Sequence, residues 1–210
     1  MEPELLRRAY LYSLVLRHCI LNGKERELRL LFQQSTPACA SYELITLARV
    51  RPLSHPTLYM LLKSYCRQHP GSNWAFVWCA EFGFLNLLSR TLDEGADLHF
   101  GYEQALRVAA TAGQDTAVLL LLERGADLHI YDDAPLYTAV YCGHKSTVQL
   151  LLDHRADVHA GDERALRWAV LRQHYDVARV LIEHGAHVPT ALQNTFNEHA
   201  KSWLQNNMKT

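Results

Sequence analysis

Histidine and cysteine are the residues of this chain whose types and spacing could do chemistry. The 210 residues include 12 histidines and five cysteines, and His99, His129 and His159 follow one another at intervals of 30 residues. Imidazole and thiolate groups bind zinc and act as catalytic bases and nucleophiles. The regular spacing therefore predicts either a shared metal or catalytic site, or a structural role that recurs along the chain.

The interval between these histidines argues against a shared site. Helices that stack on one another lie about 8 to 10 Å apart, whereas a bond from zinc to nitrogen is about 2 Å long. Ligands for one ion cannot be spread along such a ladder, and the same holds for His144 with His174. We expect each imidazole to hydrogen-bond the backbone of its adjoining loop, with no metal and no cofactor.

Catalytic motifs are also missing from the sequence. It contains no P-loop, GxSxG, HExxH or GxGxxG pattern. Cys142 and His144 are two residues apart at a helix end, where side chains do not face each other. The chain is therefore expected not to be an enzyme. The alternative is a small enzyme or metalloprotein that assembles Cys and His side chains from different repeats.

Charge and cysteine content narrow the class of protein further. The 21 Lys and Arg residues balance 22 Asp and Glu residues, so no net field favours nucleic acid or an anionic membrane as a partner. The cysteines are odd in number and form no CxxC pair, which indicates reduced thiols and a place inside the cell. No apolar run is long enough for a signal peptide or a membrane span. We expect a cytoplasmic protein, with the nucleus as the alternative.

Several residue types recur at the same interval as the histidines. The columns contain Ala96, Ala126, Ala156 and Ala186; Gly83, Gly113 and Gly143; Leu106, Leu136 and Leu166; and Ala109, Ala139 and Ala169. Self-similarity with such a period is typical of repeat arrays. Extended back to Gly23, the register predicts degenerate N-terminal repeats and a cap in 1–70, clearer repeats at 71–100, 101–130, 131–160 and 161–190, and a capping helix in 191–210.

Each repeat is expected to contain two helices. In 131–160, apolar and small residues at helical spacing predict a helix over 134–142 that ends at Gly143, and a second helix from 145 to about 154. The segment 155–160 is too short for another helix and is expected to be a loop or hairpin. The small column residue Ala139 should allow neighbouring helices to approach closely. Thr190 is expected to cap the closing helix.

These residues resemble the ankyrin repeat. The motif APLYTAVYCGH at 134–144, the LLL runs at 120–122 and 150–152, and the GAD or RAD at 95–97, 125–127 and 155–157 carry the likeness. The resemblance implies an all-α solenoid of stacked helix-turn-helix repeats with short hairpin loops, because the period is 30 residues rather than about 33. Arg107, Tyr137 and Arg167 stand in the place of the family's histidine.

The resemblance also implies a function. The segment ADVHAGDERALRWAV at 156–170 is similar to repeats common in giant viruses of amoebae, and short divergent ankyrin arrays occur in effectors of intracellular bacteria. A pathogen protein of this kind would bind a host protein noncovalently, in the host cytoplasm, and sequester or relocalise it.

Ankyrin-like units bind partners through a concave surface formed by the loops and the outward side of the first helices. Tyr, Trp and Arg are enriched in binding hot spots, and Tyr102 and Tyr131, beside turn residues, are the strongest candidates. The resemblance places the following residues on that surface: Trp78, Phe82, Tyr102, Glu103, Tyr131, Asp132, Asp133, Asp162, Glu163, Arg164, Trp168 and Arg172. The expected partner is another protein, not nucleic acid or a membrane.

Overall fold

The computed structural model describes residues 18–22, 24, 26–27, 30, 55–193 and 198–206, and within these ranges every regular element is a helix. The chain divides into two compact units. The first unit comprises residues 1–79 and 89–96, and the second comprises 80–88 and 97–210. Most of the degenerate repeats predicted in 1–70, including Gly23 of the glycine column, lie outside the described residues.

The first unit contains α4 (His55–Gln68), most of α5 (Asn73–Phe82) and the end of α6 (Leu85–Asp93). Its core is aromatic: Trp78 is 1% exposed and meets Tyr65 edge-on, with 5.6 Å between the ring centroids. Cys66 and Cys79 are free and buried, as expected for reduced thiols. They hydrogen-bond each other, and this bond and burial raise the pKa of the Cys79 thiol.

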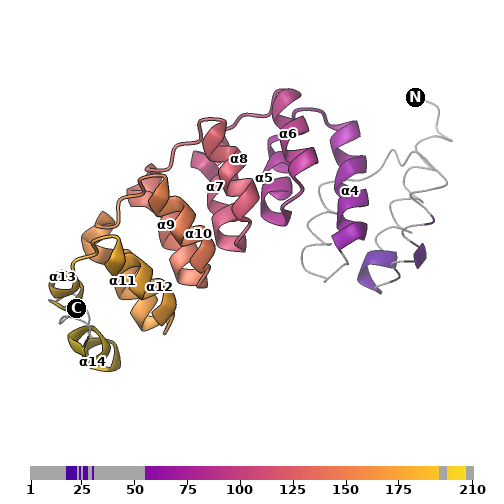
Figure 1. Cartoon of the computed structure of the whole chain (residues 1–210). Coiled ribbons are helices and arrows are strands. Elements are labelled where there is room, and N and C mark those ends of the chain that lie inside the picture. Colours follow the sequence, from indigo (N-terminus) through magenta and orange to yellow (C-terminus); the bar gives the residue numbers. More distant parts are fainter. Residues whose placement is uncertain are drawn as a thin grey trace, which may run out of the picture. The chain divides into compact units, whose positions relative to one another are not determined.

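The second unit is built from consecutive helix pairs (Figure 1). Each pair consists of a first helix and a second helix. First helices pack on first helices, since α9 contacts both α7 and α11, and second helices pack on second helices, since α10 contacts both α8 and α12. The helices are α7 (Phe100–Ala112), α8 (Asp115–Glu123), α9 (Ile130–Cys142), α10 (Lys145–Asp153), α11 (Ala160–Leu171), α12 (Tyr175–Glu183), α13 (Val188–Gln193) and α14 (Glu198–Asn206).

The core of the second unit explains why the pairs stack. A leucine recurs at every fifteenth position, alternately on a first and a second helix, and each is no more than 1% exposed: Leu106, Leu121, Leu136, Leu151, Leu166 and Leu181. Burying one leucine contributes about 1.5–3 kcal/mol. Ala109, Ala139 and Ala169 are fully buried, in keeping with close approach of the first helices. The predicted all-α stack of helix-turn-helix repeats is confirmed.

Glycine terminates the first helices as predicted. Gly113 and Gly143 adopt left-handed backbone with φ of 69° and 79°, and each amide donates to carbonyls of the preceding turn. Gln173 holds the same place after α11 and adopts a φ of 62° despite its side chain. The chain therefore makes the same turn at each of these three sites.

The C-terminal region differs from the expected single helix. It contains α13 and α14, and Thr190 lies inside α13, with its Oγ1 2.6 Å from Nδ1 of His187. The prediction that Thr190 caps the helix is therefore wrong, because the helix begins at Val188. Trp203 of α14 stacks on Tyr175 of α12 with 5.2 Å between ring centroids, which fixes α14 against the last pair.

Each of the described helices is too short or too polar to traverse a bilayer.

Candidate protein-binding face

Three left-handed turns open the first helices of the second unit. Residues 101–103, 131–133 and 161–163 all have φ between 50° and 62°, so each turn contains three consecutive left-handed residues. The short connections before them contain no β-strand in the described part of the chain. Left-handed backbone costs roughly 1–2 kcal/mol for each residue with a side chain. Such turns form only where neighbouring groups stabilise them.

A histidine and a carboxylate hold the inner side of each turn. The third turn residue points inward and is only 2–3% exposed, whereas the histidine four residues earlier lies on the surface above it. Nδ1 of His129 is 2.8 Å from Oδ1 of Asp133, and Nδ1 of His159 is 2.6 Å from Oε1 of Glu163. His99 pairs in the same way with Glu103.

Two of these pairs raise the pKa of the imidazole. The hydrogen bond to Glu103 raises the pKa of His99, and the bond to Glu163 raises the pKa of His159. A nearby carboxylate favours the charged imidazolium. The expectation that these imidazoles bond the loop backbone is wrong, because Nδ1 of each one bonds the carboxylate of the residue four positions later. It is instead the histidine backbone amide that bonds locally, to Oδ1 of Asp97, Asp127 or Asp157 at 2.9 Å.

Arginines hold the outer side of two turns. Nε of Arg107 donates to the carbonyl of Tyr102 at 3.1 Å, and its Nη2 donates to the carbonyl of Gly101 at 3.0 Å. Arg167 donates from Nη2 to the carbonyl of Gly161 at 3.3 Å. These arginines stand where the resemblance places the family's histidine, and their longer side chains reach back over the turn.

The tips of the first two turns present tyrosine to solvent. Tyr102 is 66% exposed and Tyr131 is 55% exposed, and their ring centroids are 5.5 Å apart. The guanidinium of Arg107 lies 6.0 Å from the Tyr131 ring centroid. The middle residues of the second and third turns, Asp132 and Asp162, are also exposed. Adjacent exposed aromatic rings are typical of a binding surface.

A second aromatic group lies on α9 and α11. The ring of Trp168 meets Tyr137 and Tyr141 edge-on, with centroids 6.2 and 5.4 Å apart. Guanidinium groups cover the tyrosines: that of Arg164 is 5.8 Å from the Tyr137 centroid, and that of Arg172 is 4.2 Å from the Tyr141 centroid. Sequence reasoning missed Tyr137 and Tyr141, although their i, i+4 spacing on one helix predicts a shared side.

Four of the residues predicted on the binding surface are buried, so the prediction is wrong for them. Trp78 lies in the aromatic core of the first unit, at 1% exposure. Glu103, Asp133 and Glu163 are 2–3% exposed because the left-handed backbone turns the third residue of each turn inward. Phe82 is half-buried, with its ring 6.0 Å from that of Phe84.

The remaining predicted residues of the second unit are linked by contacts, directly or through Tyr137 and Tyr141, and Asp132 and Asp162 line one pocket. Arg172 is exposed, whereas Arg164 and Trp168 are half-buried. We call this set the turn face; with the three residues that the structure adds, it consists of Tyr102, Arg107, Tyr131, Asp132, Tyr137, Tyr141, Asp162, Arg164, Trp168 and Arg172.

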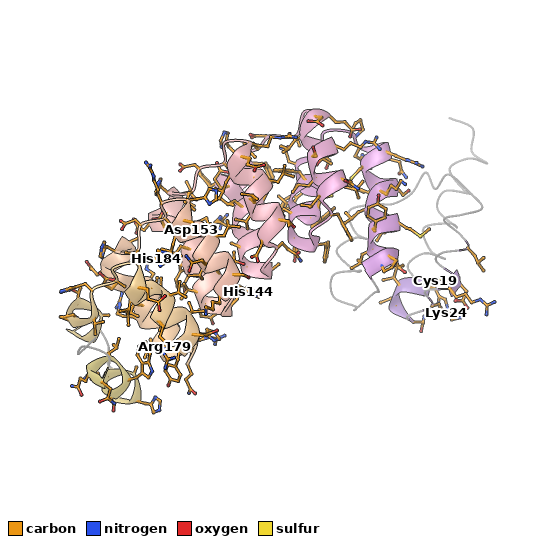
Figure 2. All side chains as sticks on the ribbon, in the orientation of Figure 1. Cys19, Lys24, His144, Asp153, Arg179 and His184 are labelled. Atoms are coloured by element: carbon orange, nitrogen blue, oxygen red, sulfur yellow. The ribbon has the colours of Figure 1, made fainter. Side chains whose placement is uncertain are left out.

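His144 follows Gly143 and His174 follows Gln173, and these two histidines have a different role. His144, labelled in Figure 2, donates from Nε2 to the carbonyl of Thr111, and His174 donates from Nε2 to the carbonyl of Tyr141. Each thus bonds the backbone of the preceding helix pair. Among the described residues, no three His, Cys, Asp or Glu side chains are grouped so that they could hold a metal ion.

Comparison with known proteins agrees with this geometry. A search of curated proteins gives no significant match. The family profile described as Ankyrin repeats (3 copies) matches residues 76–162 and 131–191, which together exceed half of the chain. Repeats of this family generally serve as protein–protein interaction modules. The chain belongs to the ankyrin-repeat family.

Proposed function

We propose that this chain is a noncovalent interaction scaffold that binds another protein through the turn face. The observation that carries the proposal is the pair of tyrosines at the turn tips. Tyr102 and Tyr131 are 66% and 55% exposed, well above the 38% of Leu171, the other large apolar side chain exposed in the second unit among the described residues. Side chains of this kind lose the most water-accessible area when a partner covers them.

The turns provide a rigid support for these side chains. Arg107 holds the first turn from outside, and a histidine–carboxylate pair holds each turn from inside. A surface that is ordered before binding loses less conformational entropy when the partner arrives. Binding by such a surface needs no chemical reaction, only complementary shape and charge.

Charged side chains around the tyrosines are proposed to select the partner. Asp132 and Asp162 contribute negative charge, and Arg164 and Arg172 contribute positive charge, so both signs lie within one surface. Charge arrangement affects partner choice and association rate more than affinity. From the resemblance of 156–170 to repeats of pathogen proteins, we further propose that the partner is a host protein, encountered in the host cytoplasm.

Affinity capture with matched variants tests the proposal. The double variant Tyr102→Ala/Tyr131→Ala removes both rings, whereas Tyr102→Phe/Tyr131→Phe keeps the ring area and removes only the hydroxyls. Proteins that wild type and the Phe variant retain, and that the Ala variant loses, would be partners of the turn face. Equal capture by all three forms would contradict the proposal.

A further inference from the structure

Residues of the left-handed turns at 131–133 and 161–163 line a pocket that is open to solvent. Its volume is about 470 Å³, and it is lined by His129, Asp132, Asp133, Asp157, His159, Ala160, Gly161 and Asp162. Sites for small groups in proteins typically measure about 300–1,000 Å³. The pocket is thus large enough to receive side chains of a partner, and it adjoins the turn face through Asp132 and Asp162.

The lining of the pocket is negatively charged. Its four aspartates outnumber its two histidines, so the charge stays negative even when both imidazoles are protonated. Asp133 is buried at 2% exposure and accepts the backbone N–H of Asp157, so salt screens its charge less than that of a surface residue. The pocket therefore attracts a cation.

Glu163 does not line the pocket, but its buried carboxylate lies behind the lining residue His159 and adds negative charge there. Glu163 is 3% exposed, and its Oε1 bonds His159, which lines the pocket. Its Oε2 is buried and has no hydrogen-bond partner among the described residues. A buried oxygen without a partner retains unsatisfied acceptor capacity, which favours positive charge nearby.

Guanidinium groups of the chain itself already lie against Asp132, which lines the pocket, and against Tyr131, the residue before it. Nη2 of Arg164 lies 3.6 Å from Oδ2 of Asp132, and the guanidinium of Arg107 lies 6.0 Å from the ring centroid of Tyr131. A carboxylate and an aromatic ring in consecutive positions are the two groups that recognise arginine best in proteins. Asp162 on the opposite turn is exposed, forms no ion pair with an arginine of the described residues, and lines the same pocket.

A metal ion is a poorer occupant than a side chain. The carboxylates of the pocket are spread around a wide opening, and no three potential ligands of the described residues are grouped closely enough for one ion. Calcium requires six to eight oxygen ligands at about 2.3–2.6 Å. An extended guanidinium, which forms several hydrogen bonds over a plane, suits separated carboxylates better.

We propose that the pocket receives an arginine side chain from an extended segment of the partner protein. This inference rests on the proposed function and specifies the chemistry of the partner: a basic segment, with an arginine between the second and third turns and apolar groups over Tyr102 and Tyr131. The arginine forms ion pairs with the carboxylates of Asp132, which Arg164 already approaches, and of Asp162.

Binding of defined peptides tests the proposal. The probe is a fluorescein-labelled 12-residue Gly-Ser peptide carrying one Arg and two Leu, and the comparison peptides carry Lys or Glu in place of the Arg. Fluorescence anisotropy is expected to show saturable binding of the Arg peptide, weaker binding of the Lys peptide and none of the Glu peptide. Backbone amide NMR shifts should change at Asp132, Asp157 and Asp162.

The double variant Asp132→Asn/Asp162→Asn removes the charges and keeps the turns, because Asn adopts left-handed backbone as readily as Asp. It should weaken binding of the Arg peptide roughly tenfold, as expected for two partly exposed ion pairs. Glu123→Gln/Glu183→Gln is the matched control, because it removes the same charge from the exposed ends of α8 and α12. Equal weakening by both variants, or equal binding of the Glu peptide, would overturn the inference.

Failure of this inference is distinguishable from failure of the proposed function. A partner that requires Tyr102 and Tyr131 and binds the Asp132→Asn/Asp162→Asn variant normally would overturn the arginine pocket alone. A partner that binds the tyrosine variant normally would contradict the turn face itself.

Discussion

Nε2 of His144 donates a hydrogen bond of 2.9 Å to the carbonyl of Thr111, which lies 33 residues earlier in the chain. His174 and the carbonyl of Tyr141 form the equivalent bond at 3.2 Å over the same sequence separation. The bond ties the turn of each helix pair to the end of the preceding first helix. It also brings the imidazole of His144 directly against Gly113.

The first prediction concerns this contact. A Cβ on Gly113 would lie 2.7 Å from Nδ1 of His144, and its φ of 69° is unfavourable for a side chain. We expect Gly113→Ala to lower the free energy of unfolding by about 2–4 kcal/mol, from the clash together with the backbone strain. Urea denaturation followed by circular dichroism measures this loss.

Gly125→Ala is the matched control for this measurement. Gly125 also has positive φ, at 95°, but a Cβ there meets nothing within 4 Å. Only the strain of about 1–2 kcal/mol applies. Equal losses in the two variants would show that the packing of His144 on Gly113 contributes nothing.

The second prediction concerns the close approach of first helices. Ala139 is fully buried on α9, which packs against both α7 and α11. Ala139→Leu should lower the free energy of unfolding by about 1–3 kcal/mol, because a close-packed interior has no space for three added carbons. Ser146→Leu adds a similar side chain at an exposed position of α10 and should change stability by less than about 0.5 kcal/mol. A tolerated Ala139→Leu would contradict the packing described for α9.

The helices and their packing could be predicted from the sequence because the period of the apolar residues determines them. The helix expected over 134–142 and the turn at Gly143 are both present, and the second helix, expected from 145 to about 154, is Lys145–Asp153. Spacing predicts which residues face inward on a regular helix, and glycine marks its end.

The left-handed turns could not be predicted in the same way. Tyr, Asp and Glu rarely adopt positive φ, so the turn at 131–133 looks like an ordinary polar loop in the sequence. Its third residue was therefore expected on the surface, whereas Asp133 is buried beneath His129. A signal was present in the recurring His-x-x-x-Asp/Glu spacing, which is the separation of side chains that meet across one helical turn.

The exposure of the candidate binding residues could be predicted for some positions and not for others. Tyr102, Tyr131 and Asp162 are exposed as expected, because each occupies the first or second position of its turn and only the third position points inward. Trp78 is buried because α5 is apolar around its whole circumference, so helical spacing does not distinguish an outward side.

The third prediction concerns pH. The folded state raises the pKa of His99 and His159, so protonated imidazole stabilises it. This contribution is fully present below the unfolded pKa of about 6.5 and is lost as pH rises through the folded pKa. We expect the midpoint temperature of thermal unfolding to decrease as the pH rises from 6 to 9. The decrease should be smaller in His99→Gln/His159→Gln.

A histidine without a carboxylate partner provides the control. Nδ1 of His154 bonds the carbonyl of Leu150, so His154→Gln leaves the histidine–carboxylate pairs intact. Its pH profile should match that of wild type. A double variant with an unchanged profile would show that the pairs with Glu103 and Glu163 do not couple protonation to folding.

The fourth prediction concerns the arginine over the first turn. Arg107→Met keeps much of the apolar stem but removes both hydrogen bonds to the carbonyls of Gly101 and Tyr102. Amide hydrogen exchange within 101–104 should accelerate, and the free energy of unfolding should fall by about 0.5–2 kcal/mol. Arg179→Met, at an exposed position of α12 that Figure 2 labels, should leave exchange in this segment unchanged. Equal exchange in the two variants would argue against a role of Arg107 in ordering the turn.

The most direct test of the account is the affinity of a captured partner for the two tyrosine variants, measured by isothermal titration calorimetry. Two exposed rings at the centre of an interface each contribute about 1–2 kcal/mol or more. Tyr102→Ala/Tyr131→Ala is predicted to weaken binding roughly 30-fold or more, while Tyr102→Phe/Tyr131→Phe stays within about threefold of wild type. An Ala variant that binds as tightly as wild type would contradict the claim that the turn face is the binding surface.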